Sequence, residues 1–270
     1  MITLTDQTGR ELSFKEIPER IVSLVPSLTE LLCELQLESE LVGVTKFCVH
    51  PAHIRKEKKV VGGTKQVHYH KVAALEPDII LCNKEENTLE MVQELEKIAP
   101  VHVSDIVDID DCIEVILQYG TLFNRKEEAH ALAQNITTEK NNFLQEIQNL
   151  PSKKVAYFIW KDPWMVAGNN TFINYLLEIN HFVNIYKDAS RYPEVQIETL
   201  EEEYAPDYLF LSSEPFPFTE KQLPLLQTHI KKARMVLVDG EFFSWYGSRL
   251  LKAFTYFKQL HKELTEIDKE

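Results

Sequence analysis

Histidines occur in two short clusters in the amino-terminal half, His50 with His53 and His68 with His70. Neutral imidazole is the most common nitrogen ligand of transition metals in proteins. Neither cluster lies in a regular hydrophobic repeat, which indicates loops. If the two loops converge, the four side chains provide ligands for zinc, or for the metal of a haem or a corrinoid. Their spacing fits no zinc-finger pattern, so solvated loop histidines are the alternative.

Sequence patterns of common enzymes are missing. The chain contains no G-x-G-x-x-G, no G-x-x-x-x-G-K-[ST], no G-x-S-x-G and no H-E-x-x-H. We therefore expect a binding protein that is not an enzyme. A metal-dependent enzyme that uses the four loop histidines is the alternative.

Short apolar strands alternate with helical patterns in the amino-terminal half. RIVSLV (20–25) is a continuous apolar run of the kind found inside a parallel sheet, and Pro26 ends it. Ser27 and Glu30 then have the spacing of a capping box. Strand–helix–strand order predicts a parallel sheet with helices on both faces. Further strands are expected over 41–45, 78–82 and 101–103, and helices over 88–98 and 110–123.

The pattern changes at residue 124. Residues 124–150 contain no strand pattern, glycine or proline, so they predict one long helix, and the alternation restarts at 154–160. KVAALEPDIILC (71–82) and ETLEEEYAPDYLFLS (198–212) both place a short helix before Pro-Asp and an apolar strand, which indicates an internal repeat. The sequence therefore predicts an α/β fold with two Rossmann-like lobes that have mostly parallel sheets, bridged by one long helix. The expected bounds are 1–123, 124–150 and 151–270.

Composition narrows the partners and the location. The 270 residues are 44% hydrophobic and carry a formal charge of −13, which indicates a globular protein and argues against nucleic acid as a partner. The start, MITLTDQTGRELSF, has no signal-peptide pattern, so a cytoplasmic location is expected. A periplasmic or membrane-associated location is the alternative if the natural amino terminus is missing.

The run RIVSLVPSLTELLCEL, followed by LVGVT, HP, VVGG and KVAALEPDIIL, resembles the cobalamin- and siderophore-binding proteins of ABC importers. This family is also called class III substrate-binding proteins or helical-backbone metal receptors. The resemblance implies a monomer without a covalent cofactor that holds cobalamin, haem or a ferric siderophore in a cleft between two lobes and delivers it to an ABC permease. A cytosolic cobalamin- or metal-binding protein that is not coupled to transport is the alternative.

The resemblance also implies site residues. Ligand contacts are expected from loops at the strand ends: His50, Thr64, Lys65, Asn83, Lys84, Trp160, Trp164, Tyr192, Phe242 and Trp245. An anionic iron chelate would need basic side chains, for which the further candidates are Lys46, Lys161, Arg191 and Arg249. Family members dock on the permease through one acidic residue on each lobe. Glu198 occupies this position in the second repeat and His70 occupies it in the first.

Overall fold

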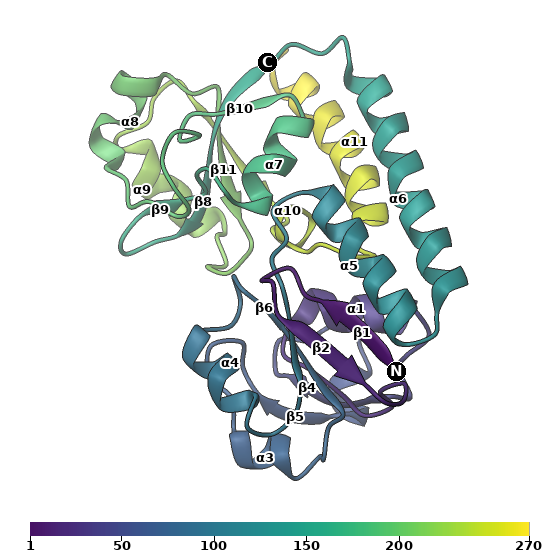
Figure 1. Cartoon of the computed structure of the whole chain (residues 1–270). Helices are drawn as coiled ribbons and strands as arrows, with labels where there is room; N and C mark the ends of the chain where they lie inside the picture. The colour runs from purple at the N-terminus through teal and green to yellow at the C-terminus, as the bar shows by residue number, and fades with distance from the viewer. Residues whose placement is uncertain (270) are drawn as a thin grey trace. The chain divides into compact units, whose positions relative to one another are not determined.

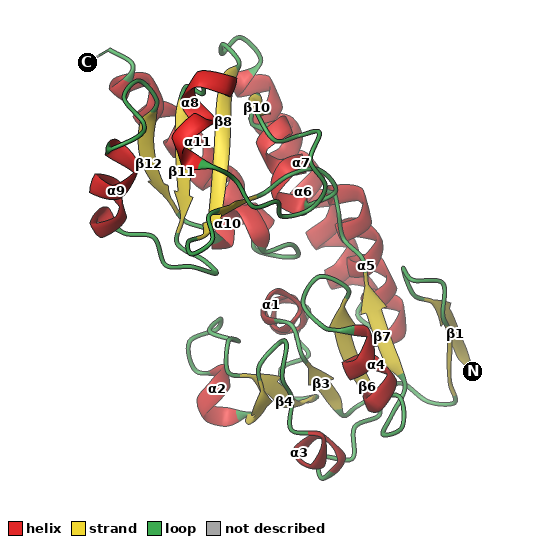
Figure 2. Cartoon of the chain, turned by 90° about the vertical axis from the view of Figure 1, so that its left-hand side faces the viewer, coloured by secondary structure: helices red, strands yellow, loops and turns green. Residues whose placement is uncertain are grey.

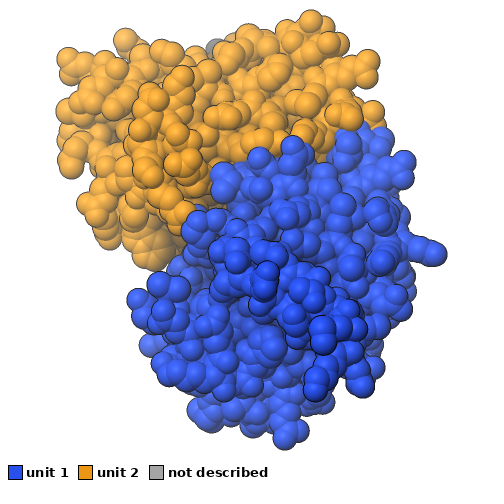
Figure 3. All heavy atoms as spheres, in the orientation of Figure 1, with its two compact units in different colours: residues 1–138, 245–251 blue, residues 139–244, 252–270 orange. Residues whose placement is uncertain are grey.

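The computed structural model describes residues 1–269 and divides into two compact units. Unit 1 comprises residues 1–138 and 245–251, and unit 2 comprises residues 139–244 and 252–270. Figure 3 colours the two units separately. The boundary falls within helix α6 (Lys126–Ile147), where the sequence predicts a long helix. Within residues 1–269, no helix combines the length and the apolarity needed to cross a membrane.

Unit 1 is built on a five-stranded sheet in which every neighbouring pair is parallel. Its order is β5 (Lys59–Gly62), β4 (Leu41–Thr45), β3 (Ile21–Ser23), β6 (Ile79–Asn83) and β7 (Val101–Ser104). All residues of β3, β6 and β7 are buried, which explains the apolar runs at β3 and β6, while β7 also buries His102 and Ser104. The helices of this unit are α1 (Pro26–Glu34), α2 (Ile54–Glu57), α3 (Tyr69–Ala73), α4 (Leu89–Leu95) and α5 (Ile109–Leu122).

An antiparallel hairpin precedes this sheet, as the sequence predicts. It consists of β1 (Ile2–Thr5) and β2 (Glu11–Phe14), with the turn at residues 6–10 (Figure 1).

The predicted capping box at the start of α1 is wrong. Val25 is the N-cap residue, and no side chain caps the helix. Pro26 occupies the first helical position, where its missing N–H costs no hydrogen bond. Glu30 does not reach back to the N-cap because its carboxylate accepts hydrogen bonds from Arg249.

Unit 2 contains a second parallel sheet (Figure 2). Its order is β10 (Phe182–Asn184), β8 (Lys153–Trp160), β11 (Tyr208–Ser212) and β12 (Arg234–Val238), with β9 (Met165–Val166) antiparallel to β8. The two short strands β9 and β10 are absent from the sequence prediction. The helices are α7 (Phe172–Ile179), α8 (Ile197–Tyr204), the 3₁₀ turn η1 (Glu220–Gln222), α9 (Leu223–Gln227), α10 (Glu241–Ser244) and α11 (Leu250–Ile267), which begins in unit 1.

The two copies of the internal repeat make equivalent hydrogen bonds through the aspartate of their Pro-Asp pairs. In unit 1, the Asp78 carboxylate accepts hydrogen bonds of 2.9 Å from the backbone N–H groups of Glu19 and Arg20. In unit 2, the Asp207 carboxylate accepts one of 2.7 Å from the backbone N–H of Lys154. Each Pro-Asp pair therefore ties its own strand to the start of the neighbouring one. The predicted α/β class, with two lobes built on parallel sheets, is confirmed.

Candidate functional site

The predicted ligand residues of unit 1 follow the carboxyl ends of its parallel strands. His50 lies after β4, Thr64 and Lys65 lie after β5, Asn83 ends β6, and Lys84 follows it. The carboxyl edge of such a sheet is where α/β folds bind ligands. We call this set of loops the unit 1 face.

Trp245 belongs to unit 1, where it contacts His50. The two rings meet edge to face with their centroids 5.4 Å apart. The guanidinium of Arg249 lies over the Trp245 ring, 4.8 Å from the ring centroid. Arg249 in turn donates hydrogen bonds of 2.7 and 3.0 Å to the two carboxylate oxygens of Glu30. Trp245 packs against His50 from inside unit 1. Because it is only 7% exposed, it offers little free ring surface to a ligand.

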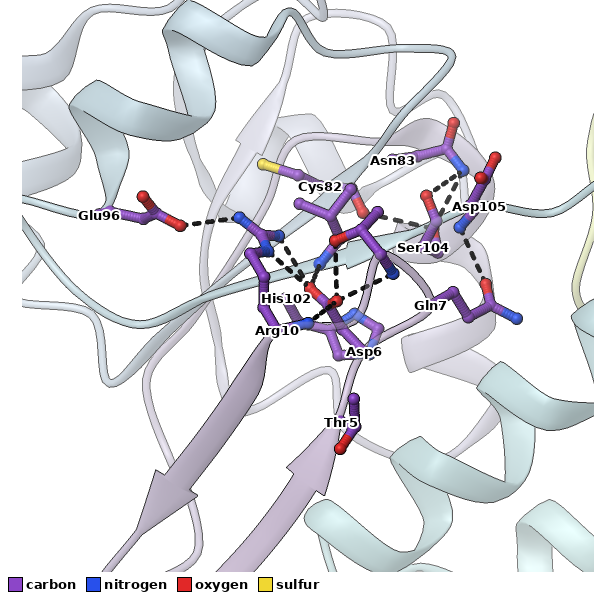
Figure 4. A network of polar contacts seen from close by, with 12 residues as sticks. Thr5, Asp6, Gln7, Arg10, Cys82, Asn83, Glu96, His102, Ser104 and Asp105 are labelled. Atoms are coloured by element: carbon purple, nitrogen blue, oxygen red, sulfur yellow. Dashed lines mark hydrogen bonds and ion pairs between the residues drawn. The ribbon is translucent and has the colours of Figure 1, made fainter.

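The Asn83 side chain points into unit 1. Its side chain is fully buried, and its Nδ2 donates to the carbonyl and the hydroxyl of Ser104, at 3.1 and 3.0 Å (Figure 4). Its Oδ1 accepts from the backbone N–H groups of Glu85 and Glu86, at 2.8 and 3.3 Å. Asn83 therefore shapes the turn that carries Lys84.

Asn87 was missed by the sequence reasoning. Its Nδ2 donates a hydrogen bond of 2.8 Å to the carbonyl of Thr64. Its Oδ1 accepts a hydrogen bond of 2.9 Å from the backbone N–H of Asn83. One buried amide thus joins the loops after β5 and β6. A polar residue four positions after the strand carries no pattern that would have revealed this role.

Three predicted lysines follow the strands of unit 1, and the first, Lys46, is exposed with its Nζ 4.9 Å from the Phe47 ring centroid. The other two have oxygen partners. Lys65 Nζ donates 2.5 Å to the carbonyl of Glu85, and Lys84 pairs with the carboxylate of Asp105. The neighbouring carboxyl of Glu86 is half-buried, and burial raises its pKa, while Lys65 and the Thr64 hydroxyl partly counteract this. The face is therefore polar, and two of its three predicted lysines are already engaged by oxygen atoms of the chain.

Aromatic side chains mark the carboxyl ends of the strands in unit 2. Trp160 ends β8 and is 40% exposed, and its ring forms a T-shaped pair with Phe216, with the ring centroids 5.8 Å apart. Phe216 was not predicted. Trp164 instead stacks on the buried Phe218, with centroids 6.0 Å apart, and packs against the core of the unit.

The remaining predicted aromatics of unit 2 are half-buried. Phe242 stacks on Tyr256 with centroids 4.7 Å apart. Tyr192 lies beside Arg191, whose guanidinium is 5.8 Å from the ring centroid. Trp160 is thus the predicted aromatic of unit 2 with the most exposed ring.

The four loop histidines do not assemble into one centre. His50 contacts Trp245, whereas His68 and His70 lie near each other with ring centroids 5.9 Å apart. His53 Nε2 instead lies 2.7 Å from Glu38 Oε1. Among residues 1–269, the group of three or more His, Cys, Asp or Glu side chains with ligand atoms close enough for one metal ion is Glu38, His53 and Glu57.

The two predicted docking residues occupy equivalent positions. His70 is the second residue of α3 and Glu198 is the second residue of α8. Each helix precedes a Pro-Asp strand of its own unit, and both side chains are exposed.

Known proteins that are similar to this chain include substrate-binding proteins of ABC importers. A Bacillus subtilis (strain 168) protein named "Uncharacterized ABC transporter substrate-binding lipoprotein YvrC" is 25% identical over 74% of this chain, and the match spans 65% of that protein. A Pectobacterium carotovorum protein named "Vitamin B12-binding protein" is 23% identical over 93% of this chain and 90% of its own length.

Solved structures share the fold. The periplasmic vitamin B12-binding protein BtuF of Vibrio cholerae superposes with a TM-score of 0.77 at 19% identity, over 91% of this chain and 99% of its own. The periplasmic heme-binding protein HutB of Vibrio cholerae gives 0.75 at 21% identity, over 89% and 98%.

These relatives correct the expected location. They are named as a lipoprotein and as periplasmic proteins, which points to an extracytoplasmic location. The cytoplasmic location expected from the first residues is therefore wrong, and so is the cytosolic alternative derived from it. The model of one protein family, described as "Periplasmic binding protein", matches residues 21–236 of this chain. Since this match covers most of the chain, the protein belongs to the periplasmic binding protein family.

Proposed function

We propose that this chain is the substrate-binding protein of an ABC importer and that it carries a tetrapyrrole or another metal chelate. The observation that carries the proposal is the family match over residues 21–236. The names of the relatives, which include vitamin B12- and heme-binding proteins, support this class of ligand. The protein binds its ligand without transforming it and acts as a monomer.

The lysine contacts of the unit 1 face and the aromatic side chains of unit 2 favour a corrinoid or a haem over a ferric siderophore of high negative charge. Lys65 and Lys84 are engaged by Glu85 and Asp105, so an anionic chelate would first have to displace these contacts. Trp160 and Phe216 instead offer aromatic surface, which suits a flat macrocycle.

Native mass spectrometry after separate incubation with cobalamin, haem and a ferric siderophore tests the proposal. We expect a 1:1 complex with cobalamin or haem, a monomeric protein and a ligand of unchanged mass. A chemically altered ligand would support the enzyme alternative. Failure of all three ligands to bind would contradict the proposed class.

Replacing Trp160 with alanine is expected to weaken ligand binding by about 1–3 kcal/mol, the usual range for a buried aromatic contact. The ring is exposed in the free protein and would be covered by the macrocycle. Quenching of tryptophan fluorescence during titration measures the affinity. Leu225→Ala, which removes an apolar side chain that is 51% exposed elsewhere in unit 2, is the control. Equal affinities of the Trp160→Ala and Leu225→Ala variants would remove Trp160 from the site.

Docking on the permease is expected to depend on the charges at positions 70 and 198. If the permease presents arginines there, His70→Glu should accelerate association, and Glu198→Gln should slow it several-fold. Both effects should shrink as the salt concentration rises, because exposed charges are screened. Association with the cognate permease in nanodiscs, followed by surface plasmon resonance, is the measurement. Loss of docking in His70→Ala would show that the imidazole itself is an anchor and would contradict the expected gain.

A further inference from the structure

We infer that Glu38, His53 and Glu57 form a surface site for a divalent transition-metal ion of the Zn²⁺ type. Each residue offers one ligand atom, and the three atoms lie within 4.8 Å of one another. The site lies in unit 1, and His53 shares the loop after β4 with His50 of the unit 1 face. It replaces the four-histidine centre suggested by the sequence, of which it keeps only His53.

Buried neighbours hold the three ligands in place. Leu37, which is 2% exposed, fixes the turn that carries Glu38 after α1, and Gln36 allows this turn through its φ of 59°. Ile54 is fully buried and anchors α2 against the unit. His53 immediately precedes α2 and Glu57 ends it, so the two side chains stand one helical turn apart.

The spacing suits a small metal ion. Four donors at about 2.1 Å from zinc in a tetrahedron lie about 3.4 Å from one another. His53 Nε2 and Glu38 Oε1 are 2.7 Å apart, so a slight separation admits the ion, and the third ligand atom is within 4.8 Å. These side chains are half-buried or exposed and can make this adjustment, while a water molecule completes the coordination.

The charges also favour a dication. The Glu57 carboxylate makes no hydrogen bond or ion pair with the described residues 1–269, although basic residues flank it in the sequence. Arg55 is directed elsewhere and donates 2.9 Å to the carbonyl of Lys46. Two carboxylates therefore lie close to His53, with all three ligand atoms within 4.8 Å of one another. A mixed nitrogen and oxygen ligand set favours zinc and similar ions over Mg²⁺ and Ca²⁺, which prefer oxygen ligands only.

The site and the unit 1 face have one loop in common, the loop after β4, and they differ in their other residues. Glu38 lies in the turn that leads into the amino end of β4, whereas the unit 1 face is formed at the carboxyl ends of the strands. Figure 2 shows α2 at the outer edge of the unit 1 sheet, where it contacts β5. Metal binding at this site is therefore testable without the transported ligand.

Isothermal titration of the purified full chain with ZnCl₂, in a buffer without chelators, tests the inference. We expect one Zn²⁺ per chain, and His53→Ala or Glu57→Gln should weaken this binding at least tenfold. Co²⁺ should give an absorption band in the visible range that both variants lose. His130→Ala, at an exposed position of α6, is the matched control and should bind as the parent does.

Two outcomes would overturn the inference. The first is wild-type Zn²⁺ affinity in both His53→Ala and Glu57→Gln, which would leave His53 and Glu38 as a simple hydrogen-bonded pair. The second is loss of Zn²⁺ binding in His70→Ala, which would assign the metal to the pair His68 and His70. Circular dichroism verifies that each variant is folded, and the exposed Glu57 provides a variant whose fold should not change.

Discussion

Replacing Arg249 with methionine is expected to lower the free energy of unfolding by about 3–5 kcal/mol. The Arg249 and Glu30 side chains are 5% and 11% exposed, and two hydrogen bonds join them. Removing the guanidinium takes two hydrogen bonds and the opposite charge away from the Glu30 carboxylate, which is poorly hydrated. The variant also loses the cationic contact with Trp245. Urea denaturation followed by circular dichroism measures the change.

Two controls separate the buried pair from a general effect of lost charge. The double variant Glu30→Gln/Arg249→Met removes both charges, so it should be more stable than Arg249→Met alone. Lys97→Met breaks the pair between Lys97 and Glu94, whose side chains are 67% and 50% exposed, and should cost less than about 1 kcal/mol. A loss in Arg249→Met no greater than in Lys97→Met would refute the assigned role.

The sequence predicted the sheets because burial on both faces leaves a continuous apolar run. RIVSLV and PDIIL are such runs, and they became the neighbouring strands β3 and β6. The capping box failed for a different reason. Ser27 and Glu30 have the right local spacing, but Glu30 pairs with a residue 219 positions away, and no local pattern reports such a contact.

For the candidate site, too, the sequence predicted what depends on neighbouring residues and missed what depends on residues far away in the chain. The positions of Thr64, Lys65 and Trp160 at strand ends follow from the alternation of strands and helices. Side-chain direction does not, because it depends on hydrogen bonds formed after folding. Asn83 therefore turned inward to Ser104, which is 21 residues away.

The spacing of Glu57 and His53 in the sequence is compatible with a shared metal ion, although the sequence analysis did not predict Glu57 as a ligand. Glu57 stands four residues after His53, the spacing at which two side chains on a helix can share a metal ion. The third ligand, Glu38, comes from another part of the chain, and only the fold reveals its contact with His53.

Asp6 is expected to be the second residue on which the stability of unit 1 strongly depends. It lies in the turn of the amino-terminal hairpin, is 3% exposed, and forms an ion pair of 2.8 Å with Arg10 (Figure 4). Its carboxylate also accepts from the backbone N–H groups of Thr8, Arg10 and Val103, at 2.9, 3.0 and 3.0 Å. The Val103 contact fixes the hairpin to β7. Asp6→Ala leaves these donors without an acceptor and should cost about 2–4 kcal/mol.

The pH dependence of stability provides the sharper test of Asp6. Burial alone would raise the pKa of its carboxyl, but hydrogen bonds from the Arg10 and Val103 backbone, the Thr8 hydroxyl and the Arg10 side chain outweigh burial and lower it. In the unfolded chain the pKa is about 3.9. Asp6 therefore contributes its full stabilisation above that value, and the contribution is lost as the pH falls from there through the lower pKa of the folded state.

We expect Asp6→Asn to flatten the fall in unfolding free energy between about pH 5 and pH 2, because the amide does not titrate. Urea denaturation of the parent and the variant at several pH values in this range measures the two slopes. Asp188→Asn, which removes an exposed carboxylate in unit 2, is the matched control and should keep the parent's slope. If Asp6→Asn lowers stability equally at every pH, the hairpin is held by the shape of its turn, and the charge of Asp6 is not what joins it to β7.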